Sequence, residues 1–366
     1  MSENQSMADG IGEAWFSKEG PDSDIILSCR ARLARNLANF PFPLRFRDDD
    51  ADHVRSIVFD AFSRCSSPDN YQAIITSNLD LIGKKILCER DVMETSTPVS
   101  TGTGIVVSTD GVISCIVNGI DHVRLSAFKS GSACLDTFKA VKKVDDELQD
   151  FLQFAANVEN GYLTSDIADC GSGMKFSCRV HFPAITTTEQ LRGFIAKFAG
   201  KGIEFRDSFG LGGEKNSALG YFYQISTKVA GNGSEIEQLA SVIGVAKGLA
   251  DVERKISKEL FELRGTEIRD KIYKAYASLK FSLLISEKDA IEVISLIKWG
   301  KNLGIVGGIT DSELCALLYR IRSGHLQFLM KSRKFSFPKD VEKNTLLKEN
   351  SLRSLVLQEA FSSLSF

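Results

Sequence analysis

The sequence lacks the features that would place the chain in a membrane or outside the cell. Across 366 residues, no apolar run approaches the ~20 residues of a membrane-spanning helix. Residues 1–10 are polar and acidic, without the basic and apolar regions of a signal peptide. The net charge of −2 produces no global field that would attract nucleic acid or an anionic membrane. These absences predict a cytoplasmic protein with neither a nucleic-acid nor a membrane partner.

Metal-binding and nucleotide-binding patterns are missing as well. The eight cysteines contain no CxxC pair, which is typical of reduced thiols and not of a disulfide framework. The four histidines form no cluster, so the sequence predicts no metal site. A GxxxxGK[ST] loop is absent, which excludes a Walker-type nucleotide site. The glycine-rich run at 210–213 lacks the dinucleotide-binding spacing and is interpreted as a mobile loop.

The most informative feature of the sequence is a pair of arginines on a predicted strand near the N-terminus. The apolar residues 25–27 predict a strand over about 24–29 that leads into Arg30 and Arg32. Alternation along an extended chain places both guanidiniums on one face and Cys29, Ala31 and Leu33 on the other. A guanidinium presents a planar fork of donors that matches pairs of phosphate oxygens. The run therefore fits a rigid phosphate clamp, and a solvated edge strand is the alternative.

Further cations occupy predicted strand positions: Arg124, Lys175, Arg179 and Arg206. Side chains on strands are held rigidly, so a cluster of them could preorganise donors around a polyphosphate. Spacing alone does not establish that they converge, and separate surface ion pairs are the alternative.

The hydrophobic pattern changes character once along the chain. Helices are predicted at about 51–64, 132–157 and 188–200, a hairpin at 104–118, and strands at 122–128, 175–182, 202–206 and 221–226. From about residue 234 the apolar residues recur only at helical spacing, through 236–265, 268–282, 287–300, 311–331 and 349–361. We therefore expect a flexible leader over 1–22, an α+β domain over 23–233 and a helical domain over 234–366.

Several motifs together resemble the ATP:guanidino phosphotransferases, and within them the bacterial protein-arginine kinases. The run from Ser28 to Leu37, SCRARLARNL, is similar to the family's S-S-R-x-R-L-A-R-N-L, and the F-P-F-P motif follows at 40–43. Other matching segments lie at 118–124, 161–165, 171–184, 213–226, 286–304 and 325–327. The match covers nearly the whole chain.

The resemblance implies a phosphagen kinase fold, in which an antiparallel sheet flanked by helices cradles ATP and Mg²⁺ and an all-helical domain follows. It implies that Arg30, Arg32, Arg124 and Arg206 contact ATP phosphates, with Lys175 in place of a further arginine. The ATP-binding set that it implies comprises Ser28, Cys29, Arg30, Ala31, Arg32, Arg124, Lys175, Phe176, Ser177, Cys178, Arg179, Arg206 and Glu214. Only 27 residues precede the arginine strand, too few for the substrate-closing domain of small-guanidine kinases, so a protein substrate is expected.

The chain departs from the family on the guanidinium side. The family loop N-E-E-D-H reads Asn118-Gly119-Ile120-Asp121-His122 here, so both glutamates, one of them the family's base, are absent. The family cysteine aligns with Asp166, which makes Asp166 and Asp121 the candidate catalytic residues.

Three further departures lie elsewhere. Asp91 replaces a histidine, and three extra residues lie between Arg206 and Glu214. Of the family's phosphoarginine pocket only Arg353 is retained, beside Glu349, so phosphoarginine sensing is expected to fail.

Two hypotheses follow. The first is a weak protein-arginine kinase that uses Mg²⁺ and ATP. The second is a pseudokinase, a scaffold that docks a zinc-binding activator or a Clp-type AAA+ unfoldase, partners that the family resemblance implies. A homodimer is compatible with either.

Overall fold

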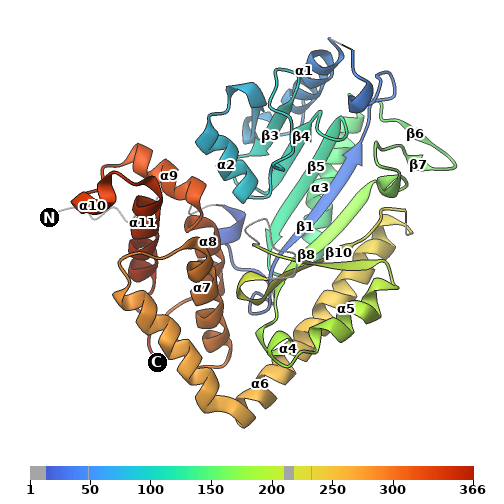
Figure 1. Cartoon of the computed structure of the whole chain (residues 1–366). Helices are drawn as coiled ribbons and strands as arrows, with labels where there is room; N and C mark the ends of the chain where they lie inside the picture. Colours follow the sequence, from blue (N-terminus) through green and yellow to red (C-terminus); the bar gives the residue numbers. More distant parts are fainter. Residues whose placement is uncertain (1–13, 48, 210–217, 232) are drawn as a thin grey trace.

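The computed structural model describes residues 14–47, 49–209, 218–231 and 233–366. An eight-stranded sheet forms its centre, in the order β2-β3-β4-β5-β1-β8-β10-β9 (Figure 1). Every neighbouring pair in it is antiparallel. Its strands are β1 (Ile26–Arg35), β2 (Tyr71–Ile75), β3 (Gly104–Ser108), β4 (Ile113–Val117), β5 (Val123–Ser130), β8 (Met174–His181), β9 (Ile203–Asp207) and β10 (Phe222–Thr227). A separate hairpin joins β6 (Ala156–Asn157) to β7 (Gly161–Tyr162).

Helices surround the sheet and continue beyond it. The α-helices are α1 (Asp50–Ser63), α2 (Leu81–Glu89), α3 (Cys134–Gln149), α4 (Pro183–Thr187), α5 (Leu191–Ala199), α6 (Glu235–Phe281), α7 (Glu287–Asn302), α8 (Asp311–Arg320), α9 (Ser323–Ser332), α10 (Lys339–Glu342) and α11 (Thr345–Ala360). Short 3₁₀ turns are η1 (Trp15–Ser17), η2 (Pro43–Arg45), η3 (Pro68–Asn70), η4 (Thr76–Asn78), η5 (Ile167–Asp169) and η6 (Leu219–Tyr221). None of the described helices is long and apolar enough to cross a bilayer.

Helix α6 connects the two parts of the molecule. It begins at a capping box, in which Ser234 and Glu237 satisfy each other's backbone N–H groups. Leu239, Val242 and Leu249 of its first half are buried in the core shared with β1, β5 and β8. Its second half, beyond a break in helical geometry at Arg264 (φ −133°, ψ 32°), packs with α7 and α8. In Figure 1 the first half follows the sheet and the second half follows the group α7–α11.

The expected fold class is confirmed, since an antiparallel sheet flanked by helices is followed by an all-helical region. The 104–118 hairpin is present as β3 and β4. The helix predicted over 132–157 ends at Gln149, because the following backbone bonds elsewhere: Ala38 N donates to Gln153 O, and Ala155 N donates to Asn36 O. The helices predicted over 236–265 and 268–282 are one helix with a kink.

The described part of the predicted leader is packed. Trp15 and Phe16 are 5% and 2% exposed. Trp15 stacks on Phe128 of β5, and Phe16 stacks on Tyr319 of α8. Burial of two aromatic side chains holds Trp15 and Phe16 between the sheet and the helical region.

Candidate phosphate-binding site

One face of the sheet carries nearly all of the predicted cations. In register, Arg32 of β1 lies opposite Lys175 of β8, and Arg30 lies opposite Ser177. Gln224 of β10 lies between Arg179 of β8 and Arg206 of β9. Directly opposed residues in antiparallel strands project to the same face. The other face is apolar, since Cys29, Ala31 and Leu33 are fully buried beneath α3 and α6.

The structure brings the cations together around one cavity of about 240 Å³. Arg30 and Arg32 come from β1, Arg124 from β5, Lys175 from β8 and Arg206 from β9. Phe176, Ser177, Gln224, Ser226, Glu94 and Glu204 complete its lining. Five cationic side chains held by four strands of one sheet form a preorganised site for an anion with several oxygens.

The surroundings of the two β1 arginines disfavour their charged forms. Burial lowers the pKa of Arg30, and burial together with the charges of Arg124 and Arg30 lowers the pKa of Arg32. Arg30 donates to Ser126 Oγ at 3.2 Å and lies over the Phe128 ring. Its Nε is buried without a hydrogen-bond partner among the described residues. A bound anion would relieve the repulsion and supply the missing acceptor.

Carboxylates stand beside these cations and offset much of their charge. Glu94 Oε1 lies 3.1 Å from Arg124 Nη1 and 3.8 Å from Arg32 Nη1. Lys175 Nζ contacts Asp169 Oδ1 at 2.5 Å, and Arg206 Nη2 contacts Glu204 Oε1 at 3.0 Å. A polyphosphate must therefore compete with carboxylates that already occupy the clamp.

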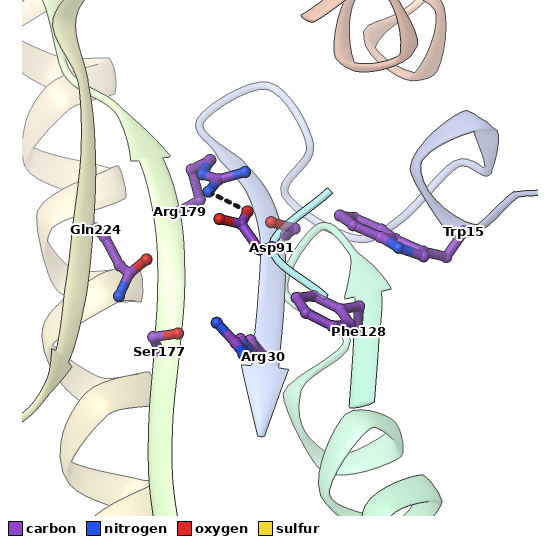
Figure 2. Close-up of a pocket in the computed structure, with 8 residues that line it drawn as sticks. Trp15, Arg30, Asp91, Phe128, Ser177, Arg179 and Gln224 are labelled. Atoms are coloured by element: carbon purple, nitrogen blue, oxygen red, sulfur yellow. Dashed lines mark hydrogen bonds and ion pairs between the residues drawn. The ribbon is translucent and has the colours of Figure 1, made fainter. Parts of the chain in front are cut away.

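A second, smaller space adjoins the cavity and shares Arg30, Ser177 and Gln224 with it. Figure 2 shows it between Trp15, Phe128 and the Asp91–Arg179 pair. Its free volume is only about 10 Å³. Arg179 closes it by donating to Asp91 Oδ2, Ser208 Oγ and Tyr319 Oη, each at 2.7 Å. The described residues around this space leave no room for a nucleoside in this direction.

The Asp91–Arg179 contact is strongly charged despite its burial. Burial opposes the charged form of Arg179, but the charge of Asp91 and the hydrogen bond to it outweigh burial and raise the pKa of Arg179. The charges of Arg179 and Arg30 outweigh burial and lower the pKa of Asp91. Both groups are therefore ionised at neutral pH, and the contact is an ion pair.

The predicted catalytic carboxylates do not line the cavity. Asp121 is 2% exposed, and its Oδ1 accepts from Asn36 Nδ2 at 2.8 Å and from Ser165 N at 2.7 Å. Asp166 is exposed, and its Oδ1 accepts from Ala168 N at 3.0 Å at the start of η5. Ile120 is 46% exposed on the β4–β5 loop beside Gly119, so neither residue supplies a charge there.

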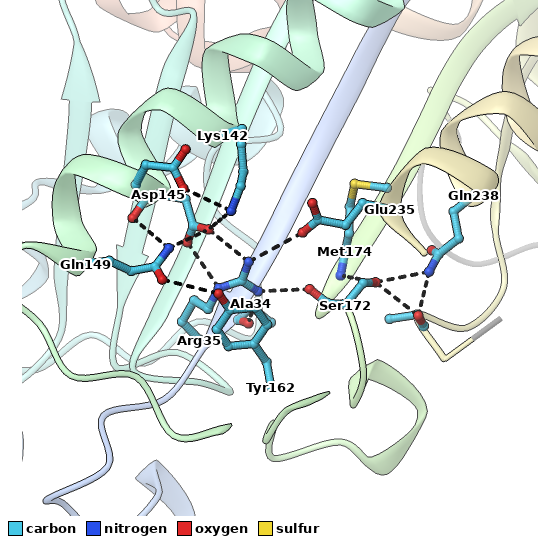
Figure 3. A network of polar contacts seen from close by, with 12 residues as sticks. Ala34, Arg35, Lys142, Asp145, Gln149, Tyr162, Ser172, Met174, Glu235 and Gln238 are labelled. Atoms are coloured by element: carbon cyan, nitrogen blue, oxygen red, sulfur yellow. Dashed lines mark hydrogen bonds and ion pairs between the residues drawn. The ribbon is translucent and has the colours of Figure 1, made fainter. Parts of the chain in front are cut away.

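Arg35, a residue of the SCRARLARNL motif, contacts other parts of the protein and does not line the cavity. Arg35 is fully buried and forms two bonds with Asp145, at 3.0 and 3.1 Å (Figure 3). It also donates to the carbonyls of Ala34 and Ser172, and its guanidinium lies 3.6 Å from the Tyr162 ring centre. Arg35 therefore joins β1, α3 and the loop before β8, and it is not part of the clamp.

The other predicted residues divide by face. Ser28 lines the small space beside Arg30, whereas Cys29, Ala31 and Cys178 are buried in the core behind the sheet. Glu214 lies outside the described residues. Arg353 is 1% exposed and donates to Ile321 O, Ile285 O and Asn350 Oδ1. Its guanidinium thus serves the contacts between helices, while Glu349 accepts from Gln327.

The sequence reasoning missed Glu94, Asp169 and Glu204 as ion-pair partners of the clamp cations. Glu204 had a usable signal, because it stands two residues before Arg206 on the same strand and must share its face. Glu94 and Asp169 lie in irregular segments after α2 and at the end of η5, where no periodicity fixes a direction.

The residues fit the implied ligands. The cavity cations and the unpartnered Arg30 Nε suit phosphate oxygens, and Glu94 supplies an oxygen ligand of the kind that Mg²⁺ prefers. When bound, Mg²⁺ and ATP would supply the transferable phosphoryl group and neutralise part of its charge.

Two solved kinase structures have a similar fold. Lombricine kinase superposes with a TM-score of 0.57 at 17% identity, covering 68% of this chain and 71% of that one. Taurocyamine kinase from Schistosoma mansoni, with bound transition-state-analogue components, gives 0.56 at 19% identity, covering 65% and 34%. These likenesses show the fold.

Comparison with related sequences identifies the protein family. Residues 53–256 match the model of the ATP:guanido phosphotransferase C-terminal catalytic domain, and residues 265–361 match that of the protein-arginine kinase McsB C-terminal domain. The protein-arginine kinase of Bacillus velezensis is 30% identical over 86% of both chains, and that of Bacillus subtilis is 28% identical over 92% of both. The chain belongs to the ATP:guanido phosphotransferase family, as a divergent relative of the protein-arginine kinases.

Proposed function

We propose that the protein transfers a phosphoryl group from ATP to arginine side chains of other proteins, with weak turnover. The observation that carries this proposal is the convergence of Arg30, Arg32, Arg124, Lys175 and Arg206 on one cavity. Phosphoryl transfer depends mainly on positioning and on stabilising charge around the transferred group, which is what such a clamp supplies.

The acceptor guanidinium needs a carboxylate that orients it and receives its proton. Asp121 is occupied by Asn36 and Ser165, which leaves Asp166 and Glu94 as candidates. Glu94 has the better position, because it lines the cavity, is 45% exposed and touches Arg124. Asp166 is the more accessible, at the exposed tip before η5.

Weak turnover follows from two features of the cleft. No carboxylate stands at Gly119 or Ile120, and general-base assistance is typically worth ~10²–10⁴-fold in rate. The clamp cations must also exchange Glu94, Asp169 and Glu204 for phosphate oxygens.

The same carboxylates favour a second candidate function, that of a catalytically inactive scaffold. An internally paired clamp is stable without nucleotide, and such a protein would act by docking a partner. A zinc-binding activator or a Clp-type unfoldase is the proposed partner, on family analogy.

Acid-labile phosphoarginine on an added arginine-rich protein is the decisive measurement, made by mass spectrometry at high enzyme concentration. We expect a low signal with the native chain, a loss with Arg124→Ala, and an increase with Ile120→Glu, which restores a carboxylate at a position where the family resemblance implies the base. Arg64→Ala is the matched control, since Arg64 forms an exposed helical pair with Asp60.

Two results would favour the scaffold instead. One is the absence of phosphoarginine from both the native chain and Ile120→Glu while calorimetry still detects ATP binding. The other is a native signal that Arg124→Ala leaves unchanged, because it would come from a contaminating kinase. Asp166→Ala and Glu94→Gln, compared in the same assay, identify which carboxylate orients the acceptor.

A further inference from the structure

Three cysteines that are far apart in sequence converge behind the phosphate clamp. Cys29 lies on β1, Cys178 lies opposite it on β8, and Cys134 is the first residue of α3. Their sulfurs are 3.0 Å (Cys29–Cys134), 3.5 Å (Cys29–Cys178) and 4.0 Å (Cys134–Cys178) apart. Within the described part of the chain, no other three cysteine, histidine or acidic side chains gather so closely around a common point while offering metal-ligand atoms.

The cluster is closed off from solvent and has an oxygen at its edge. Cys29 and Cys178 are fully buried and Cys134 is 3% exposed. The carbonyl oxygen of Gly131 lies 3.1 Å from the Cys29 sulfur. Gly131 adopts φ +63°, and a side chain there would collide with the backbone of Gly20 and Pro21. The turn that presents this oxygen is therefore tightly held.

We propose that Cys29, Cys134 and Cys178 bind one zinc ion as thiolates, with the Gly131 carbonyl as the fourth ligand. Zinc–thiolate bonds are about 2.3 Å long, which places sulfurs on a tetrahedral ion about 3.8 Å apart. The three observed separations bracket that value, so the closest pair needs to open by less than about 1 Å. Closed, four-coordinate, sulfur-rich sites are the structural type of zinc site.

The charges make zinc the better candidate than a cuprous ion. Three thiols release their protons to solvent when they bind a metal. With Zn²⁺ the site keeps one negative charge, and with Cu⁺ it would keep two, inside an apolar core where net charge is costly.

The role of the ion would be structural. Cys29 directly precedes Arg30 and Cys178 directly precedes Arg179, so the ion would join β1, β8 and α3 immediately behind the clamp. Ordinary core packing is the competing explanation, because buried cysteine behaves as a small apolar residue. Packing alone predicts no metal affinity.

The test uses the full chain, reduced and stripped of metal, with zinc and then cobalt as probes. We expect one zinc per chain that resists a weak chelator, a rise in Tm with zinc, and strong thiolate-to-cobalt charge-transfer absorption. Cys134→Ala should abolish all three effects. Cys115→Ala, which removes another fully buried thiol that is outside the cluster, should preserve them.

Protection of the native thiols keeps the test valid if Cys134→Ala fails to fold. Zinc should shield Cys29, Cys134 and Cys178 from alkylation, mapped by mass spectrometry, and leave the other five cysteines unchanged. The proposal is overturned by fully reduced protein that retains no zinc and gives no cobalt signature. Preference for cuprous ion over zinc, or a Cys29–Cys134 disulfide that persists under mild reductant, would also overturn it.

Discussion

At the residue scale, the cleft differs from a simple anion site because carboxylates stand among its cations. Glu94 is the most consequential of them, since it touches Arg124 and Arg32 and is still 45% exposed. A carboxylate in this position has two opposite effects. It repels the phosphates of a nucleotide, and it attracts the guanidinium that must approach them.

Substitution of Glu94 separates the two effects. Glu94→Gln should tighten the binding of metal-free tripolyphosphate or ATP about fivefold, because a partly exposed charge contact is worth about 1 kcal/mol. The same variant should lower phosphoarginine turnover about 100-fold if Glu94 orients the acceptor. Calorimetry gives the first number and the phosphoarginine assay gives the second.

Glu204→Gln is the matched control, because Glu204 lines the same cavity but pairs with Arg206 and Ser226 at its outer edge. It should tighten binding without lowering turnover. Higher turnover in Glu94→Gln would mean that Glu94 only obstructs the clamp, and Asp166 would then be the orienting carboxylate.

At the element scale, the motif residues hold segments together around the clamp. His122 Nδ1 accepts from Leu37 N at 2.9 Å, and its Nε2 lies 3.1 Å from Pro41 O. The His122 backbone N–H donates to Asn36 Oδ1 at 2.9 Å. One neutral imidazole thus joins the end of β1, the F-P-F-P segment and the start of β5. Its protonation on Nδ1 would break the bond from Leu37 N, while the Nε2–H would still donate to Pro41 O.

Acidification should therefore destabilise the protein through His122. Burial lowers the pKa of His122 from 6.5 to about 4. Between these values the unfolded chain binds a proton that the folded chain does not, so the free energy of unfolding falls as pH falls through this window. The share of His122 is at most about 3 kcal/mol. Urea unfolding at several pH values from 7.5 to 4 measures it.

His122→Gln provides the comparison. It should lower stability at pH 7.5 through the lost bonds and make the pH dependence below 6.5 shallower. An unchanged slope would show that His181 and His325, whose pKa values burial also lowers, account for the acid sensitivity alone.

Prediction from sequence worked where local periodicity decides the structure. The alternation along β1 correctly separated Arg30 and Arg32 from Cys29 and Ala31, and the hairpin at 104–118 formed as predicted. It failed where tertiary contacts decide, as at the end of α3, whose continuation pairs with residues 36–38. The cysteine cluster could not be predicted, because residues 29, 134 and 178 meet only through strand pairing and helix placement.

At the scale of the whole molecule, contacts made by Arg179 and Tyr319 join three regions at the edge of the cleft. Arg179 extends from β8 to Asp91 after α2 and to Tyr319 on α8. Tyr319 also stacks on Phe16 from the N-terminal segment. The sheet, the helical region and this segment therefore meet where the small space beside Arg30 is closed (Figure 2).

This closure predicts an unusual ligand preference. In the native chain ATP and tripolyphosphate should bind with similar affinity, because the described residues beside Arg30 leave a space of only about 10 Å³, too small to enclose a nucleoside. The double variant Asp91→Ala/Arg179→Ala removes both members of the ion pair and opens space beside Phe128 and Trp15. Stacking of a base there is worth about 1 kcal/mol or slightly more, so ATP should then bind roughly tenfold more tightly than tripolyphosphate.

The ratio of the two affinities cancels any general effect of the substitutions on phosphate binding by the clamp. Tyr319→Phe, which removes only the hydroxyl, should keep the native ratio. A native chain that already prefers ATP more than tenfold, or a double variant with an unchanged ratio, would contradict a closed nucleoside space.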